Sequence, residues 1–246
     1  MQPRTYWHWI EGKDLVTFTV TVKETNLYIR ATTNLQRKAH RLVLKYRAQL
    51  ENYIKQYPVF LTSLEPLPSP RYAPLIVKRM IESGQKAGVG PMAAVAGAIA
   101  DCVGADLLSL SPELIIENGG DIYLKCLTKR IVGIYAGKSP LTGKIGIEVE
   151  ARDTPIGICT SSGTVSHSLS FGKADAAVAI APTATLADAA ATAICNRVKQ
   201  PGDIASAIEF SKNISGLKGV IIIMGENMGV WGEVKLCETS AAPSGQ

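Results

Sequence analysis

The first pattern along the chain is a strict alternation of apolar and polar residues over residues 16–22. A second apolar segment, residues 27–31, follows after the polar residues 23–26. Alternation places successive side chains on opposite faces of a strand, so these segments predict a β-hairpin. Over residues 39–57 the apolar positions recur instead at spacings of three and four. That spacing predicts an amphipathic helix, which Pro58 helps to end.

A proline-rich connection separates this hairpin-helix unit, residues 1–60, from the rest of the chain. Residues 62–74 contain four prolines, which predicts a semi-rigid segment over the surface. Pro74 then suits the first turn of a further helix. The N-terminal unit is too small to look independent, so we expect a single domain over residues 1–238, with a mobile tail at 239–246.

Strands outnumber helices in the remaining sequence. We expect helices at residues 92–103, 186–198 and 204–211. We expect strands at residues 114–117, 122–126, 131–136, 145–149, 156–159 and 176–180, and a closing hairpin of residues 220–224 and 230–236. Because strands and helices do not alternate strictly, the sequence favours an α+β fold over a doubly wound sheet.

Composition excludes several classes of protein. Of the 246 residues, 46% are hydrophobic, which excludes disorder for the body of the chain. The net charge of +5 is spread along the chain, and its densest part lies on the first predicted helix. The basic residues there are Arg37, Lys38, His40, Arg41, Lys45 and Arg47. We interpret them as a solvated helix face, because neither clustered aromatics nor a known nucleic-acid reader accompanies them.

Cysteine usage and apolar segments indicate the compartment. The five cysteines are odd in number and none forms a C-x-x-C pair, which argues against a disulfide framework and a zinc knuckle. The N-terminus lacks the pattern of a signal peptide, and the most apolar stretch, residues 87–100, is too short to span a bilayer. We therefore expect a cytoplasmic protein that binds neither membranes nor nucleic acid.

A glycine-rich segment precedes one predicted helix. Gly88, Gly90 and Ala93 formally match the G-x-G-x-x-A dinucleotide fingerprint, but the preceding residues look helical and not strand-like. Two interpretations remain open. The segment either presents free N–H groups to a phosphate or packs tightly as a core helix.

The segment Asn118-Gly119-Gly120-Asp121 predicts a tight hairpin turn, since type I′ turns need positive φ at both central residues. The bare glycine N–H groups could also face a ligand. The next small-residue segment contains Ser161, Ser162 and Gly163, with His167 shortly after it. Such a run is usually only a loop, although a histidine among hydroxyls can bind phosphate or move a proton.

Asp188 and Thr192 are four residues apart, so a helix places them on one face. Carboxylate and hydroxyl oxygens are hard ligands that could hold Mg²⁺, with water and phosphate oxygens completing the shell. The alternative is a capping box, because Thr185 stands three residues before Asp188. The two interpretations can coexist.

Taken in order, four segments resemble the ApbE-like superfamily, best known for FAD:protein FMN transferases. Residues 93–101 resemble that family's G-I-A-K-G-Y-A-V-D helix, and residues 117–122 resemble its N-L-G-G-D-I turn. Residues 160–163, followed by His167, resemble its A-T-S-G loop and following histidine. Residues 187–193 resemble its A-D-A-L-A-T-A helix. The resemblance implies a T-fold-related architecture of mixed sheets packed with helices.

The resemblance also implies a site. Asp188 and Thr192, with a backbone carbonyl near Ala93, would bind a Mg²⁺ that neutralises the pyrophosphate of FAD. His167 and Asp188 would be the catalytic residues. The residues expected against the nucleotide are Gly119, Gly120, Asp121, Ser161, Ser162 and Gly163. Family members transfer FMN to a protein hydroxyl and release AMP, or hydrolyse FAD to FMN and AMP.

Two departures keep other functions open. Ala96 stands where the family helix has a lysine, and the family's D-P-x-T-G stretch after the histidine is missing. The chain therefore resembles most a shorter archaeal and anaerobe branch that has been associated with sulfur assimilation into homocysteine. The alternative to an enzyme is a protein that binds a flavin or another small molecule without catalysis, or a sulfur-assimilation factor. The sequence leaves open a homo-oligomer as well as a monomer.

Overall fold

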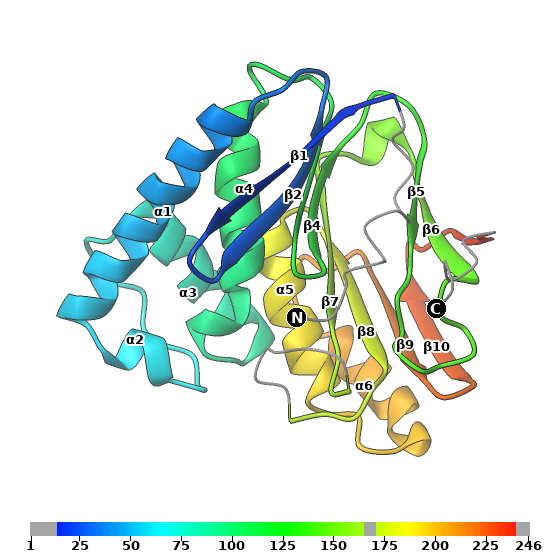
Figure 1. Cartoon of the computed structure of the whole chain (residues 1–246). Coiled ribbons are helices and arrows are strands. Elements are labelled where there is room, and N and C mark those ends of the chain that lie inside the picture. The colour runs from blue at the N-terminus through cyan, green and yellow to red at the C-terminus, as the bar shows by residue number, and fades with distance from the viewer. Residues whose placement is uncertain (1–13, 165–170, 240–246) are drawn as a thin grey trace.

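The computed structural model describes residues 14–164 and 171–239. These residues form three layers, with helices on one face of an eight-stranded sheet and a three-stranded sheet on its other face (Figure 1). All strand pairings among them are antiparallel. The α+β fold predicted from the sequence is thereby confirmed.

The large sheet has the strand order β1-β2-β3-β4-β7-β8-β9-β10, and the small sheet has the order β11-β6-β5. The strands are β1 (Val16–Val22), β2 (Thr25–Ala31), β3 (Leu114–Asn118), β4 (Asp121–Lys125), β5 (Arg130–Gly133), β6 (Ile145–Val149), β7 (Ile156–Ser161), β8 (Ala176–Ala181), β9 (Gly219–Met224), β10 (Asn227–Gly232) and β11 (Leu236–Glu238).

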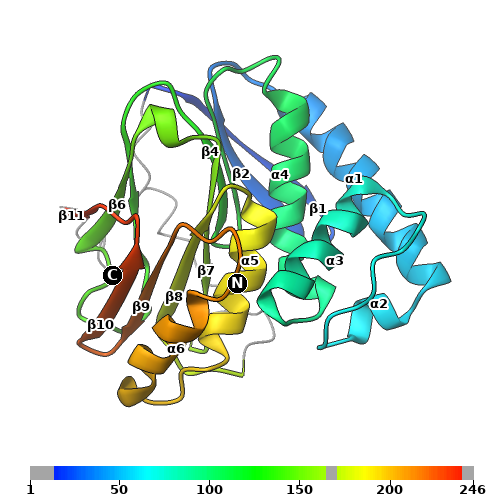
Figure 2. The same cartoon turned by 180° about the vertical axis from the view of Figure 1, so that it is seen from behind.

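The helices lie together on one side of the large sheet (Figure 2). They are α1 (Gln36–Gln56), α2 (Val59–Thr62), α3 (Leu75–Ala87), α4 (Val95–Leu107), α5 (Ala184–Cys195) and α6 (Ile204–Ser211). The chain also contains short 3₁₀ segments, which are η2 (Pro91–Ala94), η3 (Ala151–Asp153) and η4 (Pro201–Asp203). The long amphipathic helix predicted over residues 39–57 corresponds to α1, which begins earlier, at Gln36.

The central strands separate two apolar cores. Along β9, Ile222 faces the helices, whereas Ile221 and Ile223 face the small sheet. A strand that is buried on both faces reads as a continuous apolar run and not as an alternation. On β8, Ala177 and Ala179 face the helices. Their small side chains let the alanine-rich α5 approach the sheet closely.

Several predicted elements have other bounds in the structure. The strand predicted at residues 131–136 ends at Gly133, and the helix predicted at residues 186–198 is α5, which ends at Cys195. The second strand of the last hairpin was predicted at residues 230–236, but β10 begins at Asn227, directly after a turn in which Gly225 has a φ of +60°. Val234 and Leu236 prolong the apolar pattern, but Leu236 belongs to β11 of the small sheet. The helix predicted over 92–103 begins instead as the 3₁₀ segment η2, whose first residue is Pro91.

Gly88 and Gly90, before α4, have structural roles in the backbone. Gly88 has a φ of +72° and ends α3 as its left-handed cap. A Cβ on Gly90 would lie 1.8 Å from the carbonyl oxygen of Ser63, so only glycine fits there. A helix and not a strand precedes these glycines, and the dinucleotide fingerprint is therefore wrong for this fold.

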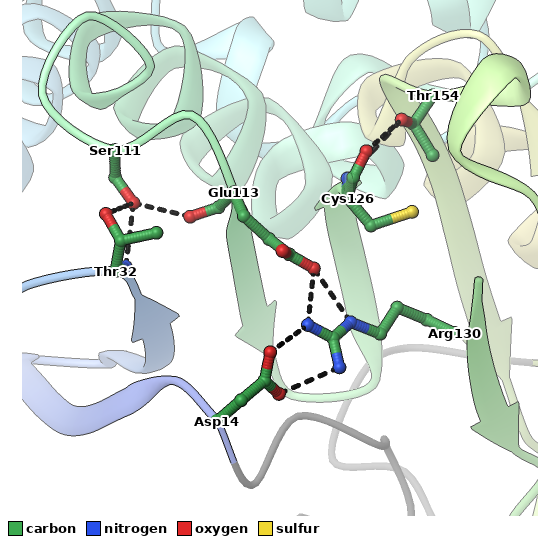
Figure 3. A network of polar contacts seen from close by, with 7 residues as sticks. All are labelled: Asp14, Thr32, Ser111, Glu113, Cys126, Arg130 and Thr154. Carbon is green, nitrogen blue, oxygen red and sulfur yellow. Dashed lines mark hydrogen bonds and ion pairs between the residues drawn. The ribbon is translucent and has the colours of Figure 1, made fainter. Parts of the chain in front are cut away.

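An ion network that is buried at Arg130 and Glu113 and exposed at Asp14 connects the two sheets (Figure 3). Arg130, on β5, donates to Glu113 at 2.7 Å and to both carboxylate oxygens of Asp14 at 2.9 and 2.7 Å. The hydroxyl of Ser111 donates to the carbonyl of Glu113 and accepts a hydrogen bond from the backbone N–H of Thr32. These contacts hold the small sheet against β3 and against the residues that precede β1.

Among the described residues, no single helix has the length and apolar composition needed to cross a membrane. The segments Leu75–Ala87 and Pro91–Leu107 meet that requirement only as a pair, across a bend of 105°.

Candidate functional site

Helices α4 and α5 pack antiparallel and very close together (Figure 2). A Cβ on Gly97 of α4 would lie 2.2 Å from the carbonyl oxygen of Ala184 and 2.9 Å from the Cβ of Asp188. The small residues of both helices, which the sequence showed as alanine and glycine runs, permit this approach.

Each helix supplies a carboxylate to the first turn of the other. Asp101, on α4, accepts hydrogen bonds from the backbone N–H groups of Ala184 at 2.9 Å and Thr185 at 2.8 Å. Asp188, on α5, accepts a hydrogen bond from the N–H of Gly97 at 2.9 Å. These N–H groups have no partner within their own helices, so the two carboxylates satisfy them across the interface.

The capping box suggested for α5 is wrong. The N-cap of α5 is Thr183, whose hydroxyl accepts a hydrogen bond from the N–H of Leu186. Asp188 lies beyond the first turn and does not cap its own helix. The hydroxyl of Thr185 donates to Asp101 and not to a group of its own helix start.

Asp188 and Thr192 lie one turn apart on α5, and both side chains are half-buried. Burial of the Asp188 carboxylate raises its pKa to about 7, although the backbone N–H groups of Gly97 and Ala96 act in the opposite direction. A nearby cation would stabilise the charged form of this carboxylate and lower its pKa again.

The glycine turn lies beside this pair. Gly119 and Gly120 have φ values of +73° and +108°, which confirms the predicted turn between β3 and β4. The N–H of Gly120 donates to Glu117 at 3.0 Å. A Cβ on Gly119 would meet nothing within 4 Å, so the outer side of this turn is open.

Asp121, the first residue of β4, points to the helix side of the sheet. It pairs with Cys159 on β7, and Cys159 belongs to the helix-side core. Asp121 is only 8% exposed, and its Oδ1 has no hydrogen-bond partner among the described residues. Burial first, and the neighbouring Asp188 carboxylate second, raise the pKa of Asp121 well above its ordinary value.

The serine loop lies at the other end of α5. Ser161 ends β7 and, two residues after Cys159, shares its helix-facing side. The hydroxyl of Ser162 accepts a hydrogen bond from the N–H of Thr164 at 3.1 Å. A Cβ on Gly163 would lie 2.0 Å from the carbonyl oxygen of Gly172, and Gly172 packs in turn against the C-terminal end of α5. His167 lies outside the described residues.

The contact with Asp188 is formed by Ala96 and Gly97, about one turn after Ala93 in the chain. Ala93 itself lies in η2, where its N–H donates to Gly90. η2 also packs against α5. Asn118 donates from its side chain to the carbonyl of Ala96 at 3.0 Å and thereby ties the glycine turn to α4.

Sequence reasoning missed Asp101, Asn118 and Cys159 as parts of this region. One signal could have found Asp101, because a carboxylate in an apolar helix must have partners when it is buried. The structure thus gathers Asp121, Ser161 and Asp188 on the helix side of β4 and β7.

The donor chemistry fits a hard cation. Carboxylate and hydroxyl oxygens predominate, and neither Asp121 nor Asp188 forms an ion pair among the described residues. Within those same residues, no three Asp, Glu, His or Cys side chains form a group that could hold a metal ion. A cation here would therefore need oxygens from a ligand and water in addition to those of the protein.

Comparisons with known proteins bear on the family and the fold of this chain. The family model described as "AbpE bacteria" matches residues 7–230. A UPF0280 protein of Methanococcus maripaludis strain C5 is 43% identical over 221 residues, which cover 87% of this chain and 90% of the relative. A UPF0280 protein of Methanosarcina acetivorans is 45% identical over 193 residues, which cover 77% and 75%.

Solved structures share the fold at low identity. The flavin transferase ApbE from Vibrio cholerae matches 92% of this chain and 97% of its own, with a TM-score of 0.58 and 13% identity. The apo form of the Pseudomonas stutzeri flavinyl transferase ApbE matches 88% of this chain and 93% of its own, with a TM-score of 0.55 and 12% identity. At these identities the likeness shows the fold alone.

Proposed function

Because this chain belongs to the AbpE bacteria family, we propose that it binds a flavin nucleotide between α5, the glycine turn and the serine loop, and that it cleaves the pyrophosphate of FAD with the help of Mg²⁺. The observation that carries this proposal is the pair of neighbouring carboxylates. Asp188 is half-buried, Asp121 is buried with an unpaired oxygen, and each has a raised pKa. Such a place favours a divalent cation, which offsets the charge of both groups.

Different residues of the chain would bind the cation and the diphosphate. Asp188 and Thr192 would hold the cation from one side of α5, with a backbone carbonyl near Ala93 as a third ligand. When bound, Mg²⁺ would neutralise the pyrophosphate and orient it for cleavage. Asp121 would lie beside the cation and the diphosphate, where the charge of Mg²⁺ would favour its ionised form.

The two loops would hold the nucleotide. Gly119 lacks a side chain and lies on the open side of the turn, so a phosphate could approach its backbone N–H closely. Gly120 would line the same turn, with its own N–H already donated to Glu117. Ser161, Ser162 and Gly163 would line the opposite side. His167 would accept the proton of the attacking hydroxyl. With a protein hydroxyl as acceptor, the products are an FMN–protein ester and AMP, and with water the products are FMN and AMP.

The test is release of AMP. The protein is incubated with FAD and Mg²⁺ under oxidising and under reducing conditions, and AMP is measured by chromatography. We expect release to need Mg²⁺ and to fall by about 100-fold or more in Asp188→Ala, since removal of a charged group that stabilises the transition state costs that much. Asp153→Ala, at an exposed carboxylate in the 3₁₀ segment η3, is the matched control and should keep full activity.

A second candidate is a protein that binds flavin without cleaving it. Asp188 already serves the first turn of α4 through Gly97, and Ala96 offers no positive charge where the family helix has a lysine. Under this alternative no AMP appears, and the wild type and Asp188→Ala retain FAD equally in equilibrium dialysis. That result would exclude catalysis through Asp188 while leaving the flavin site in place.

The described cysteines give no support to a role in sulfur transfer. Cys102, Cys126 and Cys159 are buried, and burial raises the pKa of each thiol, for Cys102 to about 11. Reactive thiols need exposure and a thiolate. Cys195 is also buried, whereas Cys237 is partly exposed on β11. A sulfur role would therefore have to begin at Cys237, and labelling with a maleimide tests its reactivity.

A further inference from the structure

Strand β1 forms one edge of the large sheet, and no strand among the described residues pairs with its outer side. Val22 and Thr25 close the β1–β2 hairpin, so alternate residues of β1 turn their backbone groups away from β2. Thr17, Thr19 and Thr21 belong to that set. The side-chain amide of Gln36 confirms the direction, because it donates to the outward carbonyl of Thr19 at 2.9 Å.

A groove runs between this edge and the first turns of α1. It has a volume of about 540 Å³. Its lining residues are Thr19, Val20, Thr21, Gln36, Arg37, His40 and Arg41, among which there is no acid. The groove is not part of the candidate flavin site, because β1 lies at the outer edge of the sheet, beyond β2 and β3 (Figure 1).

The Lys and Arg residues between positions 37 and 47 of α1 form two groups. Lys45 and Arg47, in the middle of the helix, are paired with Asp106 and Glu24. Arg37, Lys38 and Arg41, in its first turns, are exposed and form no ion pair within the described part of the chain. They also stand at the positive end of the helix, where cations are unfavourable. Carboxylates of an acidic partner would offset the unpaired positive charge of these side chains.

We propose that this groove binds an extended acidic peptide segment of a partner protein, which adds a strand to the free edge of β1. Backbone groups of the peptide would pair with the outward groups of Thr17, Thr19 and Thr21, after the Gln36 amide has moved aside. Every second side chain of the peptide would face α1, so carboxylates at alternate positions would meet Arg37 and Arg41. A sheet edge without aromatic stacking platforms favours a peptide over a nucleic acid. The proposal does not depend on flavin chemistry.

The experiment measures binding of a fluorescent peptide of alternating glutamate and valine by anisotropy. The same peptide with N-methyl groups on alternate backbone nitrogens keeps the charge but cannot pair as a strand. We expect the N-methylated peptide and the Arg37→Glu/Arg41→Glu variant each to weaken binding by about tenfold or more, and added salt to weaken it further. In amide NMR spectra, the N–H signals of Thr17, Thr19 and Thr21 should shift when the peptide is added.

The matched control is Lys138→Glu/Lys144→Glu, which makes the same charge change at exposed lysines in the connection between β5 and β6. Binding by this control should stay within about twofold of the wild type. Equal loss in both double variants would show attraction to net charge alone and overturn the proposal. Binding of the N-methylated peptide as tight as that of the unmodified peptide would also overturn the proposal. Tighter binding of oligouridylate than of the peptide, with the same sensitivity to Arg37 and Arg41, would assign the groove to nucleic acid instead. Circular dichroism and thermal unfolding confirm that each variant is folded.

Discussion

The carboxylate of Asp188 accepts a hydrogen bond from the backbone N–H of Gly97 at 2.9 Å, across the contact between α5 and α4. Asp101 makes the reciprocal contact from α4 to the start of α5. The two helices thus stabilise each other's first turns, and the distance between them is fixed by small residues. The candidate flavin site depends on this pairing because Asp188 and Thr192 take their positions from α5.

Gly97→Ala tests the closeness of the two helices. A Cβ at this position would lie 2.2 Å from the Ala184 carbonyl oxygen, which belongs to the backbone and cannot move aside cheaply. We expect a loss of about 1–3 kcal/mol in the free energy of unfolding, measured by urea titration. Gly202→Ala is the control, since a Cβ there meets nothing within 4 Å. A difference between the two variants below about 0.5 kcal/mol would contradict close packing at Gly97.

Asp101→Ala tests the cross-helix cap. Its removal leaves the buried N–H groups of Ala184 and Thr185 without their acceptor, which should cost about 2–4 kcal/mol of folding free energy. Asp153→Ala removes an exposed carboxylate and should change stability by less than about 0.5 kcal/mol. If both variants unfold at the same urea concentration as the wild type, Asp101 does not stabilise α5.

Arg130→Met tests the network that holds the small sheet (Figure 3). Glu113 would remain buried without its cation, and such a change costs about 3–5 kcal/mol. The double variant Arg130→Met/Glu113→Leu should recover much of this loss, since an apolar pair of similar volume replaces the ions. Asp14→Ala should have a smaller effect, because that carboxylate is exposed. Additive losses in the double variant would contradict a direct interaction between Arg130 and Glu113.

The stability of the metal-free protein should depend on pH through the Asp121–Asp188 pair. Their folded-state pKa values are raised above the ordinary 3.8, that of Asp188 to about 7, so the folded state holds protons that the unfolded state releases. The stabilisation is complete below about pH 4 and is lost as the pH rises towards and beyond about 7. Urea titrations with a chelator present should show this fall in wild type and a flatter profile in Asp121→Asn, which cannot ionise. Asp153→Asn should follow wild type, and an unchanged slope in Asp121→Asn would contradict the raised pKa of Asp121.

Periodicity predicted most of the elements of this fold. The alternation over residues 16–22 and the helical spacing over residues 39–57 are properties of one segment at a time, and the structure contains β1 and α1 there. The glycine pair of the turn also gave a correct prediction, because positive φ is a local demand. The last hairpin was predicted wrongly, since Val234 packs against the small-sheet core and Leu236 belongs to β11, so neither is part of β10.

For the site, the sequence by itself determined that Asp188 and Thr192 share a helix face and that Gly119 and Gly120 form a turn, since both follow from backbone geometry over a few residues. The tertiary structure alone decided that Asp188 caps α4 and not its own helix. It also decided that Asp121 lies buried beside Asp188 and that Asp101 accepts hydrogen bonds from the first turn of α5. These relationships join residues that are far apart in the chain. Their electrostatics depend on burial and on distances across packed layers, which no local pattern encodes.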